Sequence, residues 1–150
     1  MIKVYVDADA FPNLLKPILF RSIQRLNLQT YVVANKKVSI GNSSNLITYI
    51  IVEAGADEAD HKIVDMVEEG DLVITADIPL ADRIITKKAH AIDHRGALYS
   101  VDNIKQYLAM RDLMEKIRES GEVTRGPKPF GTKDAHEFAN QFNSFLAKYV

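Results

Sequence analysis

Aspartates follow strand-like segments of this sequence at three places. Asp7 and Asp9 come after IKVYV, Asp57 and Asp60 come after LITYIIV, and Asp77 follows DLVITA. Residues two apart in an extended chain face the same side, and residues three apart are neighbours on a helix. Carboxylates gathered in one place repel one another unless a proton or a cation intervenes, and Mg²⁺ or Mn²⁺ suits such hard oxygen donors. The spacing predicts an acidic metal site that could also be catalytic.

The elements that must position these aspartates alternate along the chain. Short β-branched segments predict strands, and apolar residues at spacings of three and four predict helices. We expect strands at 2–6, 28–34, 46–52, 71–76 and 89–93, helices at 12–26, 55–70, 79–88, 101–120 and 133–149, a loop at 35–45 and a turn at 94–100. Such alternation predicts a three-layer α/β/α sandwich with a mainly parallel sheet of about five strands. One domain should span 1–150, with the helical part from about 101 to 150 packed on the same core.

Ligands of open parallel sheets bind outside the carboxyl ends of the strands, which is where these aspartates fall. Local interpretations stay open beside the metal site. Asp57 could stabilise a helix dipole, Asp77 could cap the following helix, and Asp9 could hold a turn. Asp7 is harder to explain in this way, because it ends a buried strand, where an unpartnered carboxylate is costly.

The composition excludes several kinds of chemistry. The chain has 150 residues, 47% of them apolar and 26% charged, a net charge of -1 and no cysteine. A thiol nucleophile, an iron–sulfur cluster and a cysteine zinc site are therefore excluded, and the lack of thiols fits the cytoplasm. No apolar run reaches the length of a membrane span, and no signal-peptide pattern opens the chain. We expect a cytoplasmic protein that does not contact a membrane.

Charge is unevenly distributed along the chain. The segment 53–82 holds ten acidic residues and one base, whereas 83–133 holds eleven bases and six acids. An acidic centre beside a basic stretch suits a metal site that handles a polyanion. The basic residues expected to contact phosphate are Arg95, Arg111, Arg125 and Lys128. For the arginines, pairing with nearby acids such as Asp112, Glu115 or Glu122 is the alternative.

Several segments resemble, in chain order, the bacterial YaiI/YqxD family, whose members are regarded as PIN-like. They are DADAFP (7–12), GADEADHKIV (55–64), GDLVITADIPLADRI (70–84) and AMRDLMEKIRESGEVTRGPKPF (109–130). In PIN-type nucleases such acids hold a divalent metal for phosphodiester hydrolysis. The resemblance implies a metal-dependent nuclease, acting on RNA rather than DNA, with Asp7, Asp57 or Asp60, Asp77 and Asp82 at the metal. Phe11 stands where the family usually has cysteine, so a thiol role is excluded for this chain.

Two other functions remain open. VYVDADA resembles the opening of haloacid-dehalogenase-type phosphatases, which would make Asp7 a nucleophile and Asp9 a general acid and base. A noncatalytic PIN-like module that binds RNA or a protein is the other alternative, because a fold does not settle a function. His61 and His94 show no regular ligand spacing, so we expect surface or hydrogen-bonded histidines there.

Overall fold

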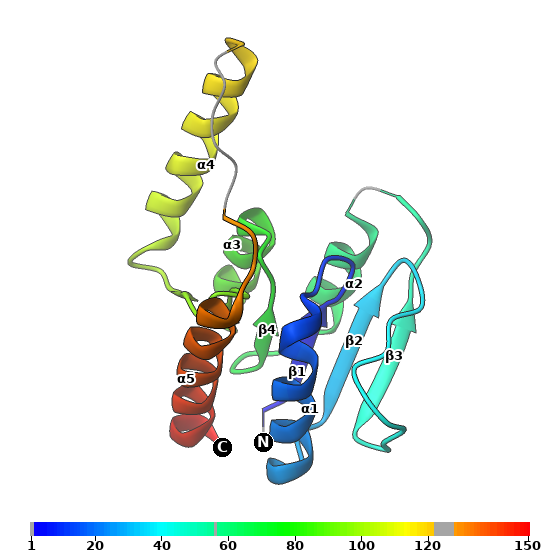
Figure 1. Cartoon of the computed structure of the whole chain (residues 1–150). Helices are drawn as coiled ribbons and strands as arrows, with labels where there is room; N and C mark the ends of the chain where they lie inside the picture. Colours follow the sequence, from blue (N-terminus) through cyan, green and yellow to red (C-terminus); the bar gives the residue numbers. More distant parts are fainter. Residues whose placement is uncertain (1, 56, 122–127) are drawn as a thin grey trace.

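Six strands form one sheet in the order β3-β2-β1-β4-β5-β6 in the computed structural model, which describes residues 2–55, 57–121 and 128–150 (Figure 1). The strands are β1 (Val4–Asp7), β2 (Thr30–Ala34), β3 (Ile47–Ile51), β4 (Leu72–Ile74), β5 (His90–Ile92) and β6 (Leu98–Tyr99). The first five pair in parallel, and β6 pairs antiparallel with β5. The predicted α/β class and mainly parallel sheet are therefore confirmed.

The sixth strand lies in a segment that we expected to be only a turn. The carboxylate of Asp93 accepts the backbone N–H groups of Arg95 and Ala97, and Gly96 adopts a φ of 97°. This tight turn sends the chain back along β5, because glycine enters the left-handed region without steric cost. β6 therefore depends on hydrogen bonds that hydrophobic periodicity does not report.

Helices cover both faces of the sheet. They are the 3-10 turn η1 (Asn13–Leu15), α1 (Lys16–Leu26), α2 (Glu58–Met66), α3 (Ile78–Thr86), α4 (Ile104–Glu119) and α5 (Thr132–Tyr149). Val4 and Val6 of β1 pack in the core beneath α1 and α5, whereas Tyr5 faces the core beneath α2 and α3. This alternation along one strand produces the three layers. None of the helices in the described parts of the chain is long and apolar enough to cross a membrane.

The two C-terminal helices differ in how they meet the core. α5 buries Phe138, Phe142 and Phe145 against the α1 side of the sheet. α4 buries only Ile104 fully, and it extends beyond the sheet in Figure 1. The aromatic spacing of α5 is thus that of a core helix. The segment 35–45 contains neither helix nor strand, and it packs on the core through Ile40.

The amino ends of β1 and β4 are fastened by one buried carboxylate. Asp71 accepts the backbone N–H of Lys3 at 3.0 Å and that of Glu68 at 2.9 Å. The Lys3 ammonium also contacts the carboxylates of Glu68 and Asp71. No buried side-chain donor or acceptor of Lys3, Glu68 or Asp71 lacks a partner, so this end of the sheet is a structural clamp.

β1 and β4 are also where the strand order reverses. The chain runs outward from β1 through β2 to β3, and then returns to place β4 on the other side of β1. Helices leave the carboxyl ends of these two neighbours toward opposite faces, which opens a crevice between them. Asp7 ends β1, and Thr75 and Asp77 follow β4, so all three lie at this crevice.

Candidate functional site

An acidic hollow of about 300 Å³ lies at the crevice. Its polar lining consists of Asp7, Asp9, Asp57, Asp60, Asp77 and His94. Five aspartates predicted from three separate strand ends therefore meet in one place, as expected for a parallel sheet. Asp82, which the family resemblance also pointed to, does not line this hollow.

Thr75 connects the Asp7 carboxylate, which follows β1, to the backbone of Asp77, which follows β4. Its hydroxyl donates to Asp7 Oδ2 at 2.8 Å and accepts the backbone N–H of Asp77 at 3.0 Å. Burial raises the pKa of Asp7, the Thr75 hydrogen bond opposes this rise, and the charges of Asp77 and Asp9 add to it. The Thr75 hydroxyl therefore holds the Asp7 carboxylate and fixes the Asp77 backbone beside it.

Asp77 and Asp9 also have local structural roles. One oxygen of Asp77 accepts the Leu80 N–H at 3.0 Å, so this residue caps α3 as the local interpretation predicted. Asp9 instead accepts the N–H of Asn35 at 2.8 Å, which joins the loop after β1 to the end of β2. Each contact uses one carboxylate oxygen, so the second oxygen of each group stays available to the hollow.

Asp60 carries the largest electrostatic perturbation in the hollow. Desolvation, followed by the charges of Asp77, Asp7 and Asp57, raises the pKa of Asp60 to about 7, and a hydrogen bond with Asp77 adds to the rise. Asp57 precedes α2 in a left-handed conformation, with a φ of 66°, and its side chain makes no capping hydrogen bond. Its carboxylate lines the hollow and does not close the helix end.

His94 differs from our expectation of a surface or hydrogen-bonded histidine. It follows β5, is 8% exposed, and its Nε2 has no hydrogen-bond partner within residues 2–55, 57–121 and 128–150. The Phe11 ring contacts it edge-on, with centroids 5.4 Å apart. Burial lowers the pKa of His94 to about 4, with a smaller effect of the Arg95 charge. The strand-end rule that selected the aspartates could also have selected His94, because it stands at the end of the next strand.

A second hollow of about 270 Å³ continues from the first. Asp57, Asp60 and Asp77 line both, and the second adds the guanidinium groups of Arg83 and Arg111. Arg111 also pairs with Glu115 at 3.3 Å, the neighbour on its own helix. Sequence reasoning missed Arg83, whose Nη1 lies 3.2 Å from Nδ1 of His61. The one feature of the sequence that could have predicted Arg83 as a site residue is its position on the helix that Asp77 caps.

Two of the other predicted phosphate ligands, Arg95 and Lys128, lie outside the two hollows. Arg95 pairs with Asp134 at 2.8 Å, donates to the Lys128 carbonyl oxygen at 2.6 Å, and lies over the Phe130 ring. Neither Arg95 nor Lys128 lines the two hollows. Arg125 falls outside the described residues. The guanidinium of Arg95 therefore joins the β5–β6 turn to α5.

The side chains of the acidic hollow have the chemistry of a metal site, although they do not form a closed one. Within 2–55, 57–121 and 128–150, no group of three or more carboxylate or imidazole side chains is arranged to hold a metal ion. Hard oxygen donors and one neutral imidazole fit a divalent cation in kind.

The fold and the hollow define an α/β protein with an acidic crevice at the reversal point of a parallel sheet. The family model described as "Uncharacterized BCR, YaiI/YqxD family" matches residues 5–148, and the chain belongs to this family. A UPF0178 protein of Sulfurimonas denitrificans is 74% identical over 99% of this chain and 98% of its own length. A UPF0178 protein of Hahella chejuensis is 50% identical over 98% of this chain and 97% of its own.

One solved structure, a homospermidine synthase from Legionella pneumophila, aligns with 85% of this chain and 35% of its own. The identity is 12% and the TM-score 0.43, a likeness too weak to assign a function.

Proposed function

We propose that this protein is a divalent-metal-dependent phosphodiesterase that cleaves nucleic acid, RNA in preference to DNA. One observation carries the proposal: His94, whose buried Nε2 has no hydrogen-bond partner among the described residues, lines the same hollow as Asp60 and Asp77. A buried polar atom without a partner is costly, and so is a cluster of acids at one point. A bound cation would satisfy both.

The residues that would hold the cation are Asp7, Asp60 and Asp77, with His94 as a nitrogen ligand. Mg²⁺ or Mn²⁺, when bound, would activate a water molecule and stabilise the leaving oxygen. Thr75 would keep the Asp7 carboxylate in position through its hydrogen bond. Asp9 and Asp57 lie on the same wall and would accept protons or hydrogen bonds from water. Asp82 lines neither hollow, so we leave it out of the proposed site.

The substrate side of the proposal rests on Arg83 and Arg111. Both line the second hollow, opposite carboxylates that the two hollows share. A guanidinium can donate two parallel hydrogen bonds to a phosphate, and the phosphate would then lie beside the proposed cation. The preference for RNA follows from the resemblance of the family to PIN-like nucleases, and the cytoplasmic location is the expectation from a composition without cysteine. Both belong to the proposal.

The test is cleavage by the metal-stripped full chain after Mg²⁺ or Mn²⁺ is added back. Labelled single-stranded RNA, structured RNA and DNA serve as substrates. We expect metal-dependent cleavage that Asp7→Asn abolishes and that Asp65→Asn retains, because Asp65 is an exposed aspartate of α2 outside both hollows. Arg83→Ala and Arg111→Ala should raise KM. Cleavage unchanged in Asp7→Asn would refute the proposal, and hydrolysis of phosphomonoesters alone would favour the phosphatase alternative.

A further inference from the structure

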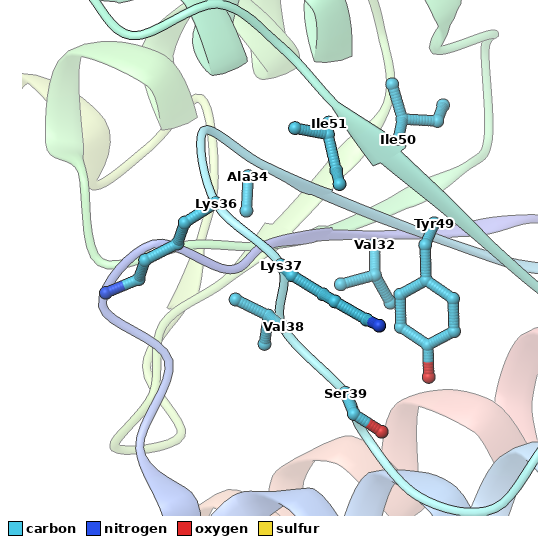
Figure 2. Close-up of a pocket in the computed structure, with 9 residues that line it drawn as sticks. All are labelled: Val32, Ala34, Lys36, Lys37, Val38, Ser39, Tyr49, Ile50 and Ile51. Atoms are coloured by element: carbon cyan, nitrogen blue, oxygen red, sulfur yellow. The ribbon is translucent and has the colours of Figure 1, made fainter.

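An apolar pocket of about 370 Å³ lies against the carboxyl halves of β2 and β3, apart from the acidic hollow (Figure 2). Its wall is formed by Val32, Ala34, Val38, Tyr49, Ile50 and Ile51, and Lys36, Lys37 and Ser39 complete the lining. Val32 and Ala34 belong to the core on the α1 side of the sheet. The bottom of the pocket is therefore built from rigid elements.

The pocket leaves apolar side chains in contact with solvent. Tyr49 is 42% exposed and Ile51 is 63% exposed, on β3 at the edge of the sheet. The Tyr49 hydroxyl accepts the backbone N–H of Ile40 at 3.1 Å, which holds the ring in place. An exposed aromatic ring that is already fixed loses little conformational entropy when it binds a flat ligand.

The charged residues that line the pocket are basic. They are Lys36 and Lys37, and no acidic residue from the described parts of the chain lines it. In Figure 2 the Lys37 side chain extends toward Tyr49, whereas Lys36 points away from the apolar wall. Lys36 directly follows Asn35, whose N–H donates to Asp9 of the acidic hollow. A ligand with a flat apolar part and a negative charge could therefore use the pocket and reach toward the hollow.

We propose that this pocket binds one base of a single-stranded nucleic acid, stacked on Tyr49, with the adjacent phosphate at Lys36. The inference rests on the proposed function, since it names the strand conformation that the acidic hollow would receive. An aromatic platform beside basic side chains is the usual means of binding single strands without sequence preference. In a duplex the bases are stacked on one another and cannot enter the pocket.

The test is fluorescence anisotropy of short labelled single-stranded and duplex RNA, measured in EDTA and again in Mg²⁺ with the Asp7→Asn chain. We expect Tyr49→Ala to weaken single-strand binding by roughly 5- to 100-fold, the range that one lost base stack gives. Duplex binding should not change. Tyr49→Phe retains the ring and should bind single strands within about twofold of wild type. Lys36→Ala should weaken both single-strand and duplex binding and reduce the salt dependence of binding.

Other occupants of the pocket give different results. If β3 instead pairs with a second copy, light scattering will show a dimer of the wild-type chain that Tyr49→Ala dissociates, while RNA binding stays unchanged. That result would overturn the inference, as would the absence of saturable single-strand binding in both buffers. Tyr49-dependent binding without metal-dependent cleavage would leave the inference standing and refute only the proposed nuclease. Cleavage that depends on Asp7 but not on Tyr49 would support the proposed nuclease and refute the inference about the pocket.

Discussion

Asp60 and Asp77 line the same acidic hollow, although Asp60 belongs to α2 and Asp77 caps α3. Carboxylates gathered in one hollow repel each other, and a proton on one of them relieves that repulsion. Desolvation and the neighbouring charges raise the pKa of Asp60 to about 7, so the proton persists close to neutral pH. Without a cation, the stability of the protein therefore depends on pH through this pair.

Asp60→Asn should change that pH dependence. The folded-state pKa lies above the unfolded value of 3.8, so the stabilising proton is fully bound below pH 3.8 and is lost as the pH rises through 7. Removing the charge should stabilise the metal-free chain at pH 8 by roughly 1 to 2 kcal/mol, a value discounted because the half-exposed group is screened. Urea denaturation from pH 5 to 8 measures this. Parallel curves for variant and wild type would contradict it.

His94→Phe should also change the pH dependence of stability. The contribution of His94 to stability changes with pH in the direction opposite to that of Asp60, over nearly the same pH range. The pKa of His94 falls from 6.5 to about 4 on folding, so its stabilising effect is present above pH 6.5 and is lost as the pH falls toward 4. The variant should gain roughly 2 to 3 kcal/mol at pH 4 relative to wild type, and about 1 kcal/mol at pH 7 because an unpartnered nitrogen is removed. If His94 is a ligand, calorimetric titration with Mn²⁺ will also show weaker binding.

Two substitutions at Asp77 should separate helix capping from metal binding. Asp77→Asn retains an oxygen for the Leu80 N–H, whereas Asp77→Ala removes the cap and should cost about 1 kcal/mol. Both should abolish Mn²⁺ binding in calorimetry, as should Asp7→Asn, while thermal unfolding of the two Asn variants stays at or above that of wild type. Unchanged Mn²⁺ affinity in Asp7→Asn and Asp77→Asn would rule out the metal site.

Arg95→Ala should lower stability without affecting cleavage. Arg95 pairs with Asp134 of α5 and donates to the Lys128 carbonyl oxygen, and it lines neither hollow. We expect a loss of about 1 kcal/mol in urea denaturation, because the pair is partly exposed. KM should match that of wild type. A raised KM with unchanged stability would instead support the original expectation that Arg95 contacts phosphate.

Gly96→Ala should destabilise the fold more than Gly70→Ala. Both glycines have a left-handed φ, 97° and 88°, so both substitutions introduce backbone strain. A Cβ at Gly96 would also lie 2.8 Å from the backbone oxygen of Glu137 in α5, whereas nothing lies within 4 Å of one at Gly70. We expect losses of roughly 2 to 3 and about 1 kcal/mol in urea denaturation. Equal losses would mean that α5 moves aside without cost.

The gathering of five aspartates could be predicted because it follows from topology alone. Parallel strands present their carboxyl ends at one edge, so Asp7 and Asp77 had to be neighbours once β1 and β4 were adjacent. The unpartnered nitrogen of His94 could not be predicted, because it depends on how Phe11 and the hollow enclose the ring. Periodicity reports which side of an element is apolar, and it carries no information on such tertiary enclosure.

The basic residues show the same limit of prediction from sequence, because their positions also depend on tertiary structure. Arg95 and Arg111 were selected by position in the basic stretch, yet only Arg111 lines a hollow with the acids. Asp134, which engages Arg95, belongs to a helix at the other end of the basic stretch. Arg83 was missed because its place beside the aspartates requires α3 to leave the crevice at the observed angle. Charge counts therefore indicated which region of the chain carries the basic residues, but they did not identify which of those side chains lie beside the aspartates.

The clamp at Asp71 and the crowding at the opposite strand ends have a consequence for how sequence changes would be tolerated. At the amino edge the carboxylate completes a hydrogen-bond network, whereas at the carboxyl edge Asp7 and Asp60 are held against electrostatic repulsion. In a survey of all single substitutions, replacing Asp71 should reduce the amount of protein in the cell. Neutral replacements of Asp7 or Asp60 should leave that amount unchanged or raise it, and the effect on fitness would appear only where the activity is needed.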